Sequence, residues 1–186
     1  MNRIKQMLGN SILAISIAKL NLDCIKIKLM DNKEGKGWTR AQADVAEIAY
    51  KQFLQLNLKY PGKSIVPTTT CDAFWHMHIL DTQKYAADCQ NIFGYFLHHF
   101  PYFGMRGEKD AANLKMAFDE TKALYASEFG EANYMNVGEP DGIEVYAVCS
   151  GTSSCEGSTC TGAQCSVLAT PSLINSGRPT FDTLAA

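Results

Sequence analysis

The chain of 186 residues lacks both long hydrophobic runs and blocks of basic charge. No stretch reaches the roughly 18 apolar residues that a membrane-spanning helix needs, so the sequence predicts no membrane span. Lysine and arginine number 17 against 19 acidic residues, and no cluster of five or more basic residues occurs. Such clusters are typical of proteins that bind nucleic-acid phosphates, and we therefore expect no nucleic-acid partner.

The sequence also lacks a recognisable secretory signal. An apolar run follows Arg3 and Lys5, but Lys19 closes it and no A-x-A cleavage pattern directly follows. The seven cysteines are an odd number, whereas a secreted disulfide framework usually needs a small, cysteine-dense domain behind a signal peptide. We therefore expect a cytoplasmic protein with reduced thiols.

The chain does contain clear helical signals. Residues 4–28 begin with helical spacing of apolar residues and end in an alternating, strand-like pattern; without a partner strand, helix is the favoured interpretation. Thr39 predicts the start of a second helix, which Pro61-Gly62 ends. A further helix is predicted over 108–129.

The longest helical pattern begins after three threonines and predicts a central helix over 71–97, with a break near Gly94. The predicted fold is all-α, a compact bundle of four to five helices in a domain over 1–135. Residues 136–186, where Ser, Thr, Gly and Cys dominate, are predicted to form a flexible C-terminal tail.

All four histidines lie in or just after the central helix. His78 falls on its apolar face, where an unpaired imidazole would cost a few kcal/mol, so we expect a partner for it. His76 lies about 200° away and cannot chelate one ion together with His78 from a regular helix. It shares a face with Asp72 instead, and His98 or His99 would fold back towards either histidine.

Two interpretations of these residues stay open. In the first, His78 is a core histidine bonded to Tyr85 or to a backbone carbonyl, and Cys89 is an inert small hydrophobe. In the second, the cluster holds zinc or iron, because imidazole and thiolate suit these metals. The spacing matches neither C-x-x-C nor H-E-x-x-H. The candidate metal ligands are His76, His78, Cys89, His98 and His99, with Asp72, Tyr85 and Asp88 behind them.

The second notable feature is a set of evenly spaced thiols in the predicted tail. They are Cys149, Cys155, Cys160 and Cys165. Thiols at this spacing would collect a soft metal, form disulfides or be modified by a partner enzyme, and a poorly constrained tail is the alternative interpretation.

The central residues resemble the glycine-rich domain-containing protein family. The resemblance covers about residues 38–107 and is carried by Asp72, Trp75-His76-x-His78-x-Leu80, Tyr85, Asp88-Cys89, Gly94 and His98-His99-x-Pro101. Tyr60-Pro61-Gly62-Lys63 and the Val66-Pro67 link also fit, whereas the Ser/Thr/Cys-rich tail departs from the family's glycine-rich segments. The resemblance implies an all-helical domain without a settled activity, and it supplies no catalytic residues.

The functional hypothesis favours a cytosolic binding or scaffold module over an enzyme, and its polar cluster either locks the core or holds a transition metal. The alternatives are a metal-dependent hydrolase or oxidoreductase, with Asp88 or Tyr85 moving protons, and a carrier that presents its cysteine tail to a modifying enzyme. A protein partner or a tail-modifying enzyme is the expected partner.

Overall fold

The computed structural model describes residues 15–129 and 178–184. Predictions for the first 14 residues and for the four tail cysteines lie outside the described residues. The helices with both ends described are α2 (Asp23–Met30), α3 (Arg40–Lys59), α4 (Thr69–Leu80), α5 (Thr82–Phe93), α6 (Glu108–Phe129) and α9 (Phe181–Leu184). The described part of the chain has no β-strand, so the prediction of an all-α fold is confirmed.

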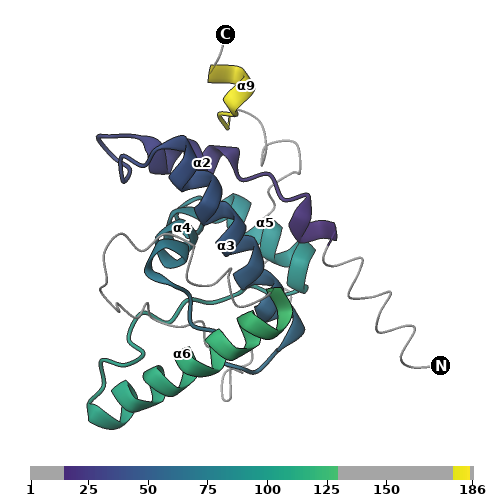
Figure 1. The fold of residues 1–186 in the computed structure, drawn as a ribbon. Coiled ribbons are helices and arrows are strands. Elements are labelled where there is room, and N and C mark those ends of the chain that lie inside the picture. The colour runs from purple at the N-terminus through teal and green to yellow at the C-terminus, as the bar shows by residue number, and fades with distance from the viewer. Residues whose placement is uncertain (1–14, 130–177, 185–186) are drawn as a thin grey trace, which may run out of the picture.

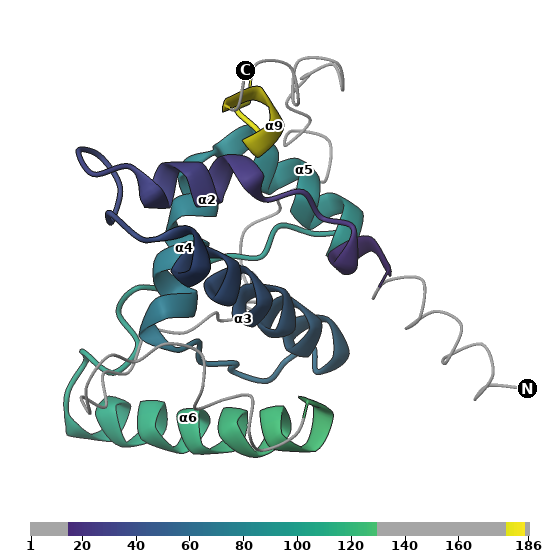
Figure 2. The ribbon, with the colours of Figure 1, turned by 45° about the horizontal axis from the view of Figure 1, so that its top comes forward.

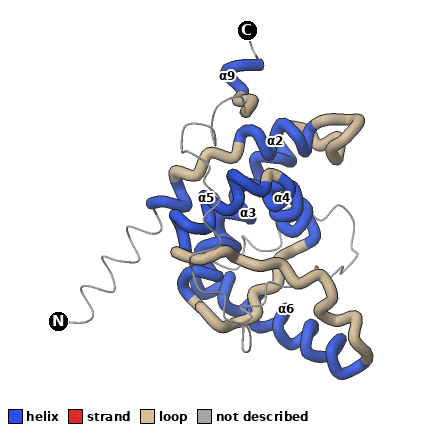
Figure 3. The backbone as a smooth tube through the Cα atoms, turned by 180° about the vertical axis from the view of Figure 1, so that it is seen from behind, coloured by secondary structure: helices blue, strands red, loops and turns tan. Residues whose placement is uncertain are grey.

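Helix α3 lies at the centre of the bundle, in contact with α2 and α4, and α2 also contacts α4. Figures 1 and 2 show α6 on one side of α3, with α2 and the short α9 on the opposite side. Seen from behind in Figure 3, the loop between α5 and α6 crosses the bundle to the start of α6. Helices α2 to α6 form the bundle, which agrees with the predicted number.

The helix ends follow the signals in the sequence. Thr39 caps α3 through a capping box, in which its side chain accepts from the Gln42 N–H and the Gln42 side chain accepts from the Thr39 N–H. Thr68 caps α4 by accepting from the Cys71 N–H. Gly94 ends α5 in the left-handed conformation, with φ of 76°. The two threonine caps agree with the predicted helix starts to within one or two residues, whereas at Gly94 only a break was predicted and the structure ends the helix there.

The predicted single helix over 71–97 is wrong, because Asp81 interrupts it. Its backbone, at φ −83° and ψ 70°, leaves the helical region. Its N–H still bonds to the His78 carbonyl at the end of α4, and its carboxylate accepts from the Lys84 N–H at the start of α5. One residue therefore ends one helix and caps the next, and the ideal rotation between residues before and after it does not apply.

The core forms between the facing sides of α2, α3, α4 and α5. On α3 the buried stripe includes Ala46, Ala49 and Tyr50, whereas Val45 and Ile48 are 38% and 57% exposed. Among the described residues, no helix is both long and apolar enough to cross a membrane.

Candidate metal centre

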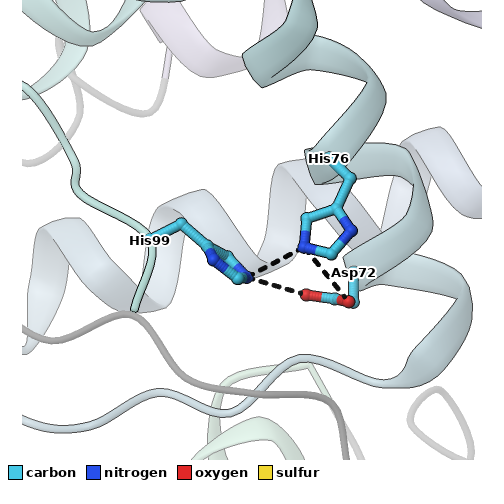
Figure 4. A group of neighbouring side chains, drawn as sticks. All are labelled: Asp72, His76 and His99. Atoms are coloured by element: carbon cyan, nitrogen blue, oxygen red, sulfur yellow. Dashed lines mark hydrogen bonds and ion pairs between the residues drawn. The ribbon is translucent and has the colours of Figure 1, made fainter. Parts of the chain in front are cut away.

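Three side chains converge where the loop after α5 passes the first two turns of α4 (Figure 4). The Nε2 atoms of His76 and His99 are 3.0 Å apart. His99 Nε2 lies 3.4 Å from Asp72 Oδ1, and His76 Nε2 lies 3.5 Å from Asp72 Oδ2. These ligand atoms, one from each residue, all lie within 4.8 Å of one another.

Local structure explains why these three groups meet. Asp72 and His76 are four residues apart on α4, and this spacing places side chains on the same face of a helix. The approach of His99 is fixed by Trp75, whose ring stands 4.7 Å from the imidazole in an edge contact. Trp75 itself is fully buried in the core, so it gives the loop histidine a rigid neighbour.

The three groups differ in their exposure. The side chains of Asp72 and His99 are 16% and 11% exposed, whereas that of His76 is 51% exposed. The centre therefore has two partly buried sides and one side open to solvent. An ion held there would keep room for water or another small ligand.

Hydrogen bonding alone satisfies this arrangement poorly. Between two neutral imidazoles, one Nε2 must carry the proton and the other must accept it. The Asp72 carboxylate can only accept, and it lies beside both nitrogens. If one imidazole donates its Nε2 proton to the other, the accepting nitrogen has no proton to donate to Asp72, so one of the three contacts lacks a donor. A cation at the centre would attract all three lone pairs at once.

The spacing matches what a metal ion requires. Four-coordinate zinc with bonds of 2.0–2.1 Å places neighbouring ligand atoms about 3.3 Å apart. The two imidazole nitrogens are 3.0 Å apart, and each lies 3.4 or 3.5 Å from a different oxygen of the Asp72 carboxylate, so the separations are close to this value. Two imidazole nitrogens and one carboxylate oxygen also suit zinc or iron(II) with further positions left open.

His78 belongs to a separate, buried network. Its Nδ1 lies 2.9 Å from the Tyr50 hydroxyl, and its Nε2 lies 3.0 Å from Asp88 Oδ2. Lys84 donates to the same carboxylate oxygen at 2.9 Å. Burial lowers the pKa of His78, although Asp88 opposes that effect. The neutral ring then accepts from Tyr50 through Nδ1 and donates to Asp88 through Nε2.

This network orders a tyrosine, a histidine and an aspartate in the manner of a nucleophilic triad. Tyr50, however, has no exposed surface, and burial raises the pKa of its hydroxyl well above the usual value. No substrate reaches a group so enclosed. We therefore interpret the network as a lock on the core, with both nitrogens of His78 already used.

Tyr85 and Cys89 lie in the same part of the core but make different contacts. The Tyr85 hydroxyl accepts from the Trp75 indole N–H at 2.8 Å and donates to the Leu97 carbonyl. Burial raises the pKa of both Tyr85 and Cys89, so the thiol keeps its proton at neutral pH. A protonated, buried thiol is a poor metal ligand.

The structure thus divides the predicted ligand set. His76 and His99 meet at the centre, joined by Asp72, which the sequence placed behind the ligands. His98, the neighbour of His99, is exposed and packs its ring on Phe96 instead. His78 and Cys89 lie within the core, in the contacts described above.

Three residues outside the predicted set turn out to be important. Tyr50 is the hydrogen-bond partner of His78. The helical spacing of the buried residues on α3 was the sequence pattern that could have placed Tyr50 in the core. Lys84, which pairs with Asp88, has a side chain that is only 7% exposed. Arg178 returns from the predicted tail to pair with Asp81, and no pattern in the sequence indicated this.

Comparison with known proteins identifies the family of the chain. A family model described as UCP032817-like matches residues 19–123, which is more than half of the chain. No curated protein and no solved structure matches this chain. The resemblance to glycine-rich domain-containing proteins is therefore wrong, because the family that matches is a different one. Trp75 and His78, which are prominent in that resemblance, are both buried in the core.

Proposed function

We propose, from the premise that the chain belongs to the UCP032817-like family, that it is a helical metal-binding module. Asp72, His76 and His99 hold one divalent transition metal, and zinc is the ion we favour. The family description names no activity, so the proposal depends on geometry. Its main support is the convergence of the two imidazole nitrogens, 3.0 Å apart, with the Asp72 carboxylate, one oxygen of which lies 3.4 Å from His99 and the other 3.5 Å from His76.

Charge and burial also support a metal site. Asp72 supplies one negative charge, which partly neutralises a divalent ion, and its 16% exposure limits competition from water. Trp75 and the helical turn between Asp72 and His76 hold the ligands in place before any ion arrives, which reduces the ordering cost of binding. Three cysteines among the described residues are free, in keeping with a cytoplasmic location.

The direct test measures metal binding by the full chain after treatment with a chelator. We expect one equivalent of Zn²⁺ by calorimetry, and a Co²⁺ complex with visible absorption bands of a low-symmetry site. Replacing His99 by alanine removes one of three protein ligands and should weaken zinc binding at least about tenfold, the range found even for outer-shell changes.

His98 offers a matched control. His98→Ala removes an adjacent histidine that makes no contact within the centre, so its zinc affinity should equal that of the wild type. The zinc affinity of His78→Ala tests the other interpretation, in which the buried histidine is a metal ligand. Equal losses in the His98 and His99 variants, or a loss only in the His78 variant, would refute the proposed centre.

Metal-dependent hydrolysis is a second candidate function, favoured by the 51% exposure of His76. A zinc ion with three protein ligands keeps a position for water and lowers its pKa towards 7. The zinc-loaded protein would then hydrolyse an activated ester such as 4-nitrophenyl acetate faster than the chelated protein and the zinc-treated His99→Ala variant. Equal rates in all three samples would leave metal binding as the function.

A further inference from the structure

The C-terminal segment 178–184 is anchored on the helical body by a charged contact. The Arg178 guanidinium donates to both oxygens of Asp81, through Nε at 2.5 Å and Nη2 at 2.6 Å. The two side chains are 18% and 27% exposed. Paired, planar bonds of this kind are the strongest form of arginine–carboxylate contact. Arg178 also holds the pKa of Asp81 below its usual range.

A second anchor lies three residues further on. The guanidinium carbon of Arg40 stands 3.3 Å from the centre of the Phe181 ring, and Lys26 Nζ stands 5.2 Å from it. Lys26 is itself buried and paired with Glu47 at 2.6 Å, so the cation beneath the ring belongs to a fixed network between α2 and α3. The ring thus sits on two cations.

Between the body and this segment lies a groove of about 360 Å³. Its walls come from α2, from the end of α4 with Asp81, and from Arg178 and Pro179. Apolar residues and Cys24 line it together with four charged residues, Lys28, Asp31, Asp81 and Arg178. Figures 1 and 2 show α9 beside α2, at the end of the bundle away from α6. The C-terminal segment is therefore one wall of the groove.

We propose that the body carries a recognition surface for its own Arg-x-x-Phe segment, and that this segment closes the groove beside Cys24. The recognition surface consists of Asp81 and Arg40 with the Lys26 network around them. The Asp81 carboxylate at the α4–α5 junction binds the arginine, and the cations of α2 and α3 bind the phenylalanine ring. A segment must therefore match two separated sites to bind.

Alkylation of Cys24 by N-ethylmaleimide measures this closure in the full chain. After timed reaction and digestion, mass spectrometry follows the peptide that contains Cys24 and separates it from the other thiols. Arg178→Gln and Phe181→Ala should each speed alkylation about three- to tenfold, because each removes one anchor. High salt should also speed the reaction of the wild type.

The charge effect on the thiol works in the opposite direction. Arg178 lowers the pKa of Cys24, against a larger rise caused by burial, so removing the arginine alone would slow alkylation. A faster reaction therefore reports access. Lys63→Gln is the matched control, since Lys63 pairs with Glu120 of α6, away from the groove, and its rate should equal that of the wild type. Unchanged rates in both anchor variants would overturn the proposal.

A binding experiment tests recognition directly. A labelled peptide of residues 176–186 should bind the full-length Arg178→Gln, Phe181→Ala double variant, whose own segment has left the surface. It should bind the wild type at least tenfold more weakly, because the attached segment competes at high effective concentration. Adding Asp81→Asn to the double variant should abolish binding. Equal binding to wild type and double variant, or none to either, would show that no such surface exists.

Discussion

At the residue scale, the two histidines of Trp75-His76-Met77-His78 have opposite environments. His78 is 1% exposed and has both ring nitrogens bonded inside the core, whereas His76 presents its Nε2 to a partly open centre. Their angular separation on the helix was predicted from the spacing alone. It follows that the two histidines of one short motif serve different purposes. His78 packs in the core, and His76, as we propose, binds metal.

The burial of neutral His78 makes stability depend on pH. Its pKa is lowered in the folded protein. Below about pH 6.5, His78 therefore binds a proton in the unfolded chain while it stays neutral in the folded chain. Stability is therefore complete above that value and falls as pH drops from about 6.5 towards the folded pKa, by at most about 1.4 kcal/mol per pH unit. Urea midpoints measured with a chelator between pH 7.5 and 5.5 should show this slope.

Two variants identify the residue responsible for the slope. His78→Gln should be less stable overall but show a flatter pH dependence over the same range. His98→Gln, which changes an exposed histidine, should keep the wild-type slope. A steep slope in the His78 variant would assign the pH dependence to another group. Aspartates whose pKa is lowered, such as Asp81 and Asp110, lose their stabilising effect only below about pH 4 and do not interfere.

Part of the candidate site could be read from the sequence. The pairing of Asp72 with His76 follows from helical spacing, and the return of a histidine from 98–99 towards His76 was among the expectations that the structure confirms. The choice of His99 over His98 depends on the path of an irregular loop past Trp75. No local pattern encodes that path, since it results from tertiary packing.

At the element scale, most helix ends were predictable because their caps use local hydrogen bonds. Thr39, Thr68 and Gly94 act within three or four residues of their own position. Asp81 was missed because the apolar pattern continues across it and aspartate is tolerated inside helices. Asp81-Thr82 after an apolar run is nevertheless a possible start of a new helix. In the folded chain this capping residue interrupts the helix that the apolar periodicity had predicted to continue.

Two glycines allow the cost of a backbone conformation to be separated from that of a clash. At Gly94, φ is 76° and an added Cβ would meet nothing within 4 Å, so Gly94→Ala should cost about 1 kcal/mol of unfolding free energy. At Gly104, φ is 89° and the Cβ would lie 2.5 Å from Leu114 Cδ2. Gly104→Ala should cost at least about 2 kcal/mol, because overpacking adds to the strain.

Denaturant unfolding of the two variants against the wild type measures these costs. Gly62→Ala, with φ of 90° and open space around its Cβ, is a second strain-only control and should resemble Gly94→Ala. If Gly104→Ala costs no more than the other two, Leu114 moves aside freely. The contact between the loop before α6 and α6 itself would then be looser than the structure indicates.

At the scale of the whole molecule, α4 separates a closed polar network from an open one. On one side, Tyr50, His78, Asp88 and Lys84 join α3, α4 and α5 inside the core. On the other, Asp72 and His76 meet His99 from the loop that crosses to α6. A metal at the open cluster would tie this loop to α4, much as the closed network ties α5 to α3. Metal binding should therefore stabilise the entire bundle and not the loop alone.

The thermal unfolding temperature tests that coupling. At a free zinc concentration of 100 times the dissociation constant, a ligand that binds only the folded chain stabilises it by about 2.7 kcal/mol. For a body of this size the melting temperature should rise by about 5–10 °C, in a single transition. His98→Ala should show the same rise, whereas His99→Ala, with binding at least about tenfold weaker, should show at most about half of it. A zinc-dependent rise of equal size in the His99 variant would place the stabilising ion elsewhere, and binding without any rise would show that the loop opens independently of the helices.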